Sequence, residues 1–128
     1  MTFEVPGKVA SNNRVTRFDG RGARKNPQAA SYQQRVFQHA FAAAQEAEWV
    51  KPEACKVEIE AYNVRLDVDN VAKNVLDGMN GAAYDDDRCV THLTIVKYVD
   101  HDGERIIVHV EPTQPLVREK KRKKAAAA

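Results

Sequence analysis

Apolar residues recur at three- and four-residue steps in two segments of the chain, and this period predicts two helices. The first segment spans residues 29–49, and Lys51-Pro52 ends it because proline disfavours helix in the residue before it. The second segment spans residues 70–80, with Asp69 as its N-cap. The face of the first helix that should pack on a core carries Tyr32, Val36, Phe37, Ala40, Phe41 and Ala44.

A period of two residues marks the predicted strands. Residues 55–64 alternate strictly, so Val57, Ile59 and Ala61 are expected on one buried face. Three further strands are predicted at residues 2–6, 89–99 and 105–111. Asp-His-Asp-Gly at 100–103 has the composition of a tight turn, which predicts that the last two strands form a hairpin.

The resulting order is strand, helix, strand, helix, strand, strand, which predicts an α+β fold with a mixed sheet packed against helices. A chain of 128 residues fits one domain with a single core. We expect this domain to cover residues 1–117 and to include a long basic loop at residues 7–28. Residues 118–128 are expected to form a flexible basic tail.

Charge is distributed unevenly, although the net charge of the chain is only +2. Residues 8–25 and 118–124 each carry a net charge of +5, whereas residues 26–117 carry −7. Basic arms suit a polyanion, because they displace the counterions condensed on nucleic acid. An acidic centre repels the same polyanion unless cations fill it, so this distribution hints at bound metal ions. A solubilising tail and a solvated surface are the alternative explanation.

Composition argues against a membrane protein and against a zinc protein. No apolar run approaches the roughly 20 residues of a membrane span, and the N-terminus does not resemble a signal peptide. We therefore expect a soluble, cytoplasmic protein with no membrane partner. Cys55 and Cys89 form no Cys-x-x-Cys pair, and the four histidines show no ligand spacing. Both cysteines are expected to be free thiols in a reducing compartment.

Six aspartates gather in the run RLDVDNVAKNVLDGMNGAAYDDDRCV. Asp67 and Asp69 lie two residues apart after a predicted strand, and extended geometry would point both to one face. Lys73 and Asp77 follow Asp69 at successive four-residue steps, so all three share one helical stripe. The run Asp85–Asp87 precedes the next strand, whose start would approach the end of the first if the two strands were antiparallel neighbours.

This cluster suits magnesium, which prefers oxygen ligands and takes one or two carboxylates together with water and substrate phosphate. Carboxylates on neighbouring elements could hold one or two Mg²⁺ ions that activate a water for attack on a phosphodiester. Lys73 would then stabilise the charge that develops on the phosphate.

Each part of the cluster also has a plainer explanation. Asp77 and Lys73 could form a surface ion pair, and Asp69 could be a helix cap. The run Asp85–Asp87 could be a solvated turn. A calcium EF-hand is excluded, because its fifth, sixth and twelfth positions would be Val71, Ala72 and Gly78.

The joint pattern is more specific than any of its parts. It comprises Asp67-Val-Asp69-Asn70-Val-Ala-Lys73, then Leu76-Asp77-Gly78-Met79-Asn80-Gly81, then Tyr84 and Asp86-Asp87 before a strand that ends in Lys97. This pattern resembles the RusA family of Holliday-junction resolvases. Ser11-Asn12-Asn13-Arg14 is similar to a Ser/Asn/Arg stretch of the same family.

The resemblance implies a homodimer that binds a four-way DNA junction and nicks two strands symmetrically, in DNA recombination and repair. It implies Mg²⁺ as cofactor, with Mn²⁺ as a substitute, and family members often belong to prophages. Asp67, Asp69 and Asp87 would be catalytic metal ligands. Asp86 would be a fourth acid at the metal, and Lys73 the catalytic cation. We expect hydrolysis to leave a 5′-phosphate.

Basic residues of the long loop are expected to bind DNA phosphates, which positions a junction without reading its bases. The residues predicted for this role are Asn13, Arg14, Arg17, Arg24 and Lys25. Two other classes of function remain open. One is a non-catalytic protein that binds branched DNA, and the other is a metal nuclease that acts on flaps or RNA.

Overall fold

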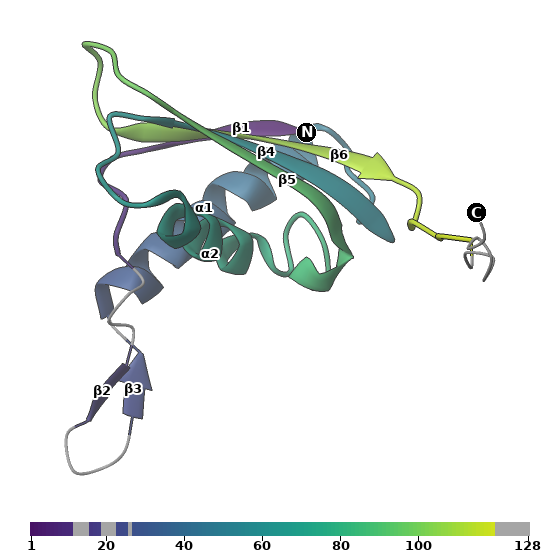
Figure 1. Ribbon diagram of the computed structural model, residues 1–128, viewed down its shortest axis with the longest axis horizontal. Coiled ribbons are helices and arrows are strands. Elements are labelled where there is room, and N and C mark those ends of the chain that lie inside the picture. Colours follow the sequence, from purple (N-terminus) through teal and green to yellow (C-terminus); the bar gives the residue numbers. More distant parts are fainter. Residues whose placement is uncertain (12–15, 19–22, 26, 120–128) are drawn as a thin grey trace, which may run out of the picture.

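The computed structural model describes residues 1–11, 16–18, 23–25 and 27–119. A four-stranded sheet forms its main body, in the order β1-β6-β4-β5, and two helices pack against one face (Figure 1). The elements of this body are β1 (Thr2–Pro6), α1 (Pro27–Glu46), β4 (Ala54–Tyr62), α2 (Val68–Met79), the 3-10 turn η1 (Asp87–Cys89), β5 (Val90–Tyr98) and β6 (Arg105–Thr113). The α+β class, the mixed sheet and the order of its main elements are as predicted.

The central strand of the sheet is β4, which pairs antiparallel with β6 and parallel with β5. Its alternation places Val57, Ile59 and Ala61 in the core, each no more than 2% exposed, as the sequence predicts. These side chains face the helices, because apolar residues at a period of two share one face of a strand.

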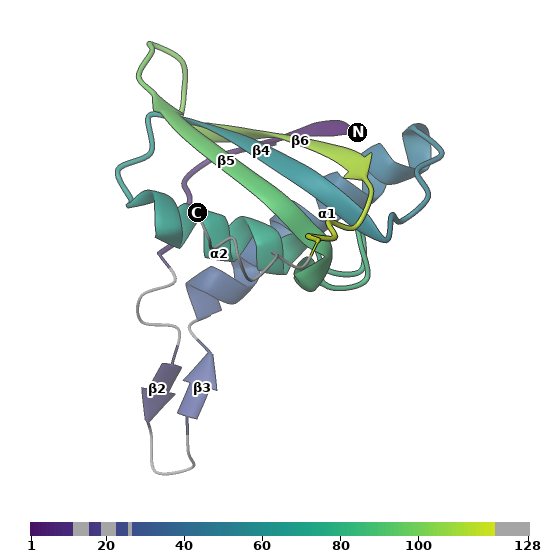
Figure 2. The same cartoon turned by 45° about the vertical axis from the view of Figure 1, so that its right-hand side comes forward.

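The predicted hairpin between β5 and β6 is wrong, because β4 lies between these two strands. The connection instead crosses the end of β4, where it forms a loop beyond the sheet (Figure 2). Asn63, which has a left-handed φ of 60°, donates from Nδ2 to Asp100 Oδ1 at 2.8 Å. Hydrogen bonds from Arg105 and Asn63 hold the pKa of Asp100 well below its usual range. The residues Asp-His-Asp-Gly at 100–103 therefore stabilise the connection from β5 across β4 to β6 and do not form a tight hairpin.

Both helices differ from the prediction at their ends. Helix α1 begins at Pro27, where proline is well suited to the first helical position, and ends at Glu46. Helix α2 begins at Val68 with Asp67 as its N-cap, so the prediction of Asp69 as the cap is wrong. Asp69 lies instead in the first turn of α2, where its negative charge interacts favourably with the positive end of the helix dipole.

The interface between α1 and α2 is tighter and more polar than the apolar pattern predicts. Phe41, expected in the core, is 45% exposed, whereas Gln33 is buried. Gln33 donates from Nε2 to Asn74 Oδ1 at 2.9 Å, and Asn74 in turn donates to the carbonyl oxygen of Ala10. These bonds satisfy polar groups that would otherwise be costly to bury. They also tie α2 to the segment that follows β1.

The predicted long loop at residues 7–28 contains a small antiparallel pair of strands, β2 (Thr16–Phe18) and β3 (Ala23–Lys25). This pair lies apart from the four-stranded sheet (Figure 2). Within the ranges that the structure describes, no helix is long and apolar enough to cross a membrane.

Candidate active site

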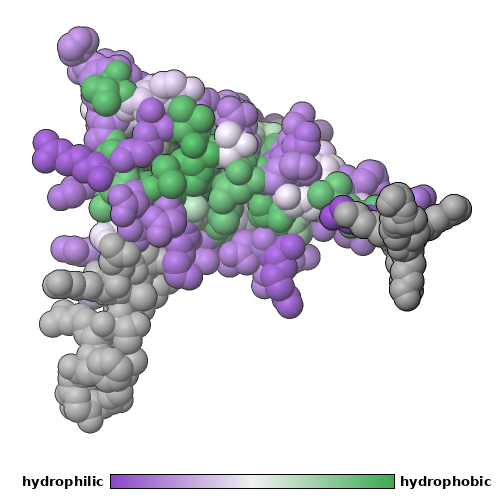
Figure 3. All heavy atoms as spheres, in the orientation of Figure 1, coloured by the Kyte–Doolittle hydropathy of each residue, from purple (hydrophilic) through white to green (hydrophobic). Residues whose placement is uncertain are grey.

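An open groove of about 560 Å³ lies between α2 and the edge strand β5. Its lining consists of Val68, Asp69, Ala72, Lys73, Leu76, Asp77, Asp87, Leu93 and Ile95. Three aspartates of the predicted cluster and Lys73 therefore line one groove, together with five apolar side chains. Hydrophobic atoms gather in the middle of the molecular face seen in Figure 3, surrounded by hydrophilic ones. Val68 and Leu93 contribute exposed apolar surface to the groove.

Helix α2 supplies three charged residues of the groove from one stripe. Asp69, Lys73 and Asp77 follow one another at four-residue steps, as predicted. Lys73 Nζ lies 3.7 Å from Asp77 Oδ2, so the surface ion pair considered above is present. Because the helix rises about 1.5 Å per residue, Asp69 and Asp77 are separated by about 12 Å along its axis. The stripe therefore extends the acidic surface along the groove instead of concentrating it at one point.

The structure does not follow the geometry by which Asp67, Asp69 and Asp87 were predicted to come together. Asp67 and Asp69 lie at a helix start, so the extended i, i+2 geometry does not apply to them. Strands β4 and β5 are parallel, so the residues before β5 lie at the opposite end of the sheet from the end of β4. Helix α2 returns from one end to the other, and its second half reaches η1, which begins with Asp87.

Hydrogen bonds fix the part of the turn between α2 and β5 that comes just before the acidic run Asp85–Asp87. Tyr84, which is fully buried, donates its hydroxyl to the carbonyl oxygen of Leu76 at 2.8 Å. Trp49 donates from Nε1 to the carbonyl oxygen of Ala83 at 2.8 Å. Asp85 points away to an ion pair with Lys51, at 3.3 Å. These contacts hold Asp87 against the second half of α2.

Asp86 and Asp87 are electrostatically unequal. The backbone N–H of Arg88 donates to Asp86 Oδ1 at 2.9 Å, which lowers the pKa of Asp86. The pKa of Asp87 is raised by its burial, by a hydrogen bond with Asp86 and by the negative charges of Asp86 and Asp77. Lys73 acts in the opposite direction and lowers it. Asp87 therefore lies where negative charge is crowded, which is where a cation binds best.

Asp67 and Asp86 do not belong to the groove lining. Asp67 makes no side-chain capping bond, although it occupies the N-cap position of α2. Across residues 1–11, 16–18, 23–25 and 27–119, no group of three or more Asp, Glu, His or Cys side chains is arranged closely enough to hold a metal ion. The structure thus brings Asp69 and Asp87 to one groove and leaves the predicted three-carboxylate centre unassembled.

Strand β5 contributes residues to the site that the acidic pattern alone does not reveal. Leu93 and Ile95 form a wall of the groove, and Lys97 donates from Nζ to the carbonyl oxygen of Leu66 at 2.8 Å. Lys97 therefore holds the backbone just before Asp67. The signal for this wall is the two-residue period of Leu93, Ile95 and Lys97, which places all three on one face of the strand.

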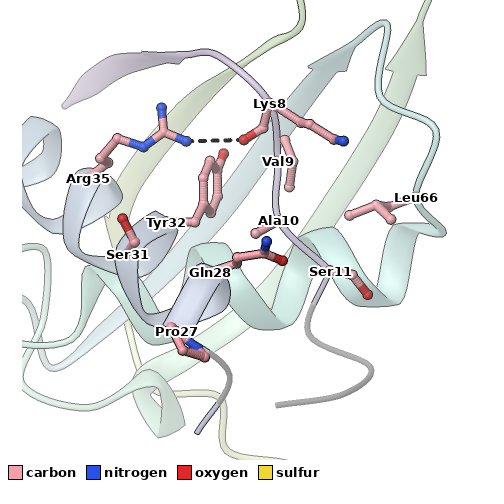
Figure 4. Close-up of a pocket in the computed structure, with 10 residues that line it drawn as sticks. All are labelled: Lys8, Val9, Ala10, Ser11, Pro27, Gln28, Ser31, Tyr32, Arg35 and Leu66. Atoms are coloured by element: carbon pink, nitrogen blue, oxygen red, sulfur yellow. Dashed lines mark hydrogen bonds between the residues drawn. The ribbon is translucent and has the colours of Figure 1, made fainter.

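A second cavity, of about 590 Å³, lies between the segment after β1 and the start of α1 (Figure 4). Arg35 closes one side by donating to the carbonyl oxygens of Pro6 at 3.0 Å and Lys8 at 3.1 Å. Tyr32 stands among the lining residues, with its ring 5.0 Å from the Arg35 guanidinium. Leu66 lines the same cavity, so it lies next to the start of α2.

The Tyr32 hydroxyl is buried and has no hydrogen-bond partner among the described residues. Replacing Tyr32 by Phe should therefore raise the free energy of unfolding by about 1 kcal/mol, because an unsatisfied buried hydroxyl costs about that much or more. Urea unfolding of the two proteins measures the difference. Tyr32→Leu is the matched control, which loses the ring packing and should be destabilised by more than 1 kcal/mol. A loss of stability in Tyr32→Phe would show that the hydroxyl has a partner.

Of the residues predicted to bind DNA, Asn13 and Arg14 lie outside the described residues. Arg17, Arg24 and Lys25 lie in the β2-β3 pair, where Arg17 is the register partner of Arg24. The prediction that these residues contact phosphates stays a prediction.

A groove that combines Asp69, Asp77 and Asp87 with Lys73 has the side-chain composition of a metal-dependent hydrolase of phosphate esters. Residues 6–111 match the family model of the endodeoxyribonuclease RusA, and the chain belongs to this family. The RusA family is a family of Holliday-junction resolvases that bind branched DNA. The comparison with curated proteins returned no match.

Proposed function

We propose that this protein is a Mg²⁺-dependent endonuclease that resolves Holliday junctions by paired, symmetric nicks in DNA recombination and repair. The observation that carries the proposal is the meeting of Asp69, Lys73 and Asp87 in one groove of a chain that belongs to the RusA family. Each nick would leave a 5′-phosphate and a 3′-hydroxyl.

The donor set fits a hard divalent cation. Asp69 and Asp87 would hold it, with Asp67 joining from the start of α2 and Asp86 from the neighbouring position in the turn. The negative charges of Asp86 and Asp77 act on Asp87 and support this assignment, because a bound cation would relieve their repulsion. Mn²⁺ should substitute for Mg²⁺, since both accept carboxylate oxygens. When bound, the cation would supply a Lewis acid and lower the pKa of a coordinated water.

Lys73 would act directly on the substrate. Its side chain is 62% exposed and is held by the 3.7 Å contact with Asp77, a pair that costs little to break at the surface. The ammonium group can therefore turn toward a phosphate in the groove and stabilise the negative charge of the transition state. Asp77 would keep the ammonium in the groove until DNA arrives.

Junction binding would come from the basic segments outside the acidic groove. The predicted contacts of Asn13, Arg14, Arg17, Arg24 and Lys25 would position phosphates without reading bases. A homodimer would present two equivalent grooves to two opposed strands. Val96 and Tyr98 are exposed apolar side chains on the face of β5 opposite the groove wall, and they support such self-association, because exposed apolar surface often marks an interface.

The proposal is tested by incubating the protein with a synthetic four-way junction, a flap, a linear duplex and an RNA of matched sequence. With Mg²⁺, we expect nicks at symmetric positions in the junction and little cutting of the other substrates. A chelator should abolish these nicks, and Mn²⁺ should restore them, because the carboxylates cannot activate water alone. Binding without cutting under all metal conditions would favour a non-catalytic junction binder. Faster cutting of the flap or the RNA would favour a different nuclease.

A further inference from the structure

The two cysteines of the chain lie together beside the proposed catalytic turn. Cys55 is in the first part of β4, and Cys89 is the last residue of η1. Their Sγ atoms are 3.7 Å apart, and both are free thiols. A disulfide has an S–S distance of about 2.05 Å, so the two sulfurs need to approach by roughly 1.6 Å to form one.

The backbone places the two residues at a suitable separation. Cys55 is the register partner of Val90 in the parallel pairing of β4 and β5, so Cys89 is one residue from the position directly across. Neighbouring strands lie about 4.8 Å apart, which is within the range that a disulfide spans. Thr91 Oγ1 also donates to the carbonyl oxygen of Cys55 at 3.2 Å, which fastens the start of β5 to β4.

The two thiols differ in how easily they meet an oxidant. Cys55 is fully buried, and burial raises its pKa to about 12, so it remains a thiol and does not react first. Cys89 is partly exposed on the turn. An oxidant from solvent therefore reaches Cys89 first. The Cys55 sulfur, 3.7 Å away on the buried side, is then placed to react with the oxidised Cys89 sulfur.

We propose that Cys55 and Cys89 form a reversible disulfide when the protein meets a hydroperoxide. The Cys89 sulfur attacks the peroxide, the O–O bond breaks, and the products are a Cys89 sulfenic acid and an alcohol or water. The Cys55 sulfur then attacks the Cys89 sulfur, the S–O bond breaks, and water leaves with the remaining thiol proton. Two thiols lose two electrons in total, and the peroxide gains them.

The disulfide would act on the nuclease through η1. Cys55 is buried near the start of the inner strand β4, so most of the movement must come from Cys89. Asp87 is the first residue of the same three-residue turn, so it shifts when Cys89 is drawn toward β4. Displacements of about 1 Å at a reacting centre can lower a rate about a hundredfold. This step rests on the proposed function, whereas formation of the disulfide does not.

The test treats the reduced full-length protein with hydrogen peroxide and maps its cysteines by mass spectrometry without reductant. We expect an intramolecular Cys55–Cys89 link, at least a tenfold slower nicking of a four-way junction, and full recovery with dithiothreitol. Cys89→Ser is the control, and its nicking should be the same before and after peroxide. Cys55→Ser tests the second step, because Cys89 should then accumulate as a sulfenic acid that a dimedone probe labels.

Each outcome decides the proposal. Absence of the link in the mapped peptides overturns the disulfide, and a link that leaves nicking unchanged overturns its coupling to Asp87. If the reduced protein nicks none of the junctions, the proposed function fails, and affinity for Tb³⁺ measured by luminescence replaces nicking. In that case weaker Tb³⁺ binding by the oxidised protein, reversed by dithiothreitol, supports the coupling to Asp87, and equal binding overturns it.

Discussion

Replacing Asp69 by Asn is expected to lower the rate of junction nicking by about a thousandfold while junction binding persists. The substitution keeps the size of the side chain and removes the negative charge that would bind Mg²⁺. A thousandfold loss corresponds to about 4 kcal/mol of transition-state stabilisation, which is reasonable for an electrostatic group at the reacting centre. Single-turnover nicking in Mg²⁺ measures the rate, and gel shift without metal measures binding.

The fold should tolerate this change. Asp69 lies in the first turn of α2, where its interaction with the helix dipole contributes only about 0.3–1 kcal/mol. The matched control is Asp85→Asn, which removes an aspartate from the same acidic stretch. Asp85 is highly exposed, pairs with Lys51 and lies outside the groove, so its loss should leave nicking unchanged. If Asp69→Asn nicked as fast as Asp85→Asn, the assignment of the groove as the catalytic site would be wrong.

The features of the site that follow from local geometry could be predicted from the sequence. The stripe of Asp69, Lys73 and Asp77 depends only on helical periodicity, which a run of twelve residues specifies. Burial of Val57 and Ile59 depends only on the alternation within one strand. In both cases, the residues that decide the outcome are close neighbours along the chain.

The features that the sequence could not predict depend on which strands become neighbours. Asp-His-Asp-Gly has the composition of a hairpin turn, yet its contacts with Asn63 fasten a crossover past β4. Alternation within β5 and β6 is compatible with either pairing, because it specifies the buried face and not the neighbour. The route by which Asp87 reaches the groove depends on this parallel pairing and on the return of α2. The acidic residues could therefore be selected from the sequence, but the strand pairing that brings Asp87 to the groove could not be predicted from it.

The contact between the two helices leads to the largest expected effect on stability. Gly78 lies within α2, and a Cβ atom added there would lie 2.7 Å from Val36 Cβ and 2.9 Å from the carbonyl oxygen of Gln33. Real Cβ contacts are essentially never that short, so α1 and α2 would have to move apart. Gly78 lies near the C-terminal end of α2, where helix propensity taken alone would favour alanine.

Two opposing contributions decide how Gly78→Ala changes the free energy of unfolding. Alanine favours the helix by about 1 kcal/mol relative to glycine. Overpacking typically costs about 1–3 kcal/mol in stability. Here the cost should be at the upper end of that range or above it, because the carbonyl oxygen of Gln33 belongs to the backbone of α1 and cannot turn aside. We expect a net loss of about 2 kcal/mol, which lowers Tm by about 8 °C for a domain of this size. Calorimetry or thermal circular dichroism measures this shift.

Gly103→Ala is the control, because a Cβ added at Gly103 has no neighbour within 4 Å, and its effect should stay within about 0.5 kcal/mol. The cause of the loss is tested by adding Val36→Ala, which removes the side chain that the new methyl group meets. Both substitutions act on one contact, so the double mutant should be more stable than the sum of the two single losses predicts. Strict additivity would show that Gly78 and Val36 do not oppose each other across the helix interface, and that α1 and α2 are not packed as closely as this contact requires.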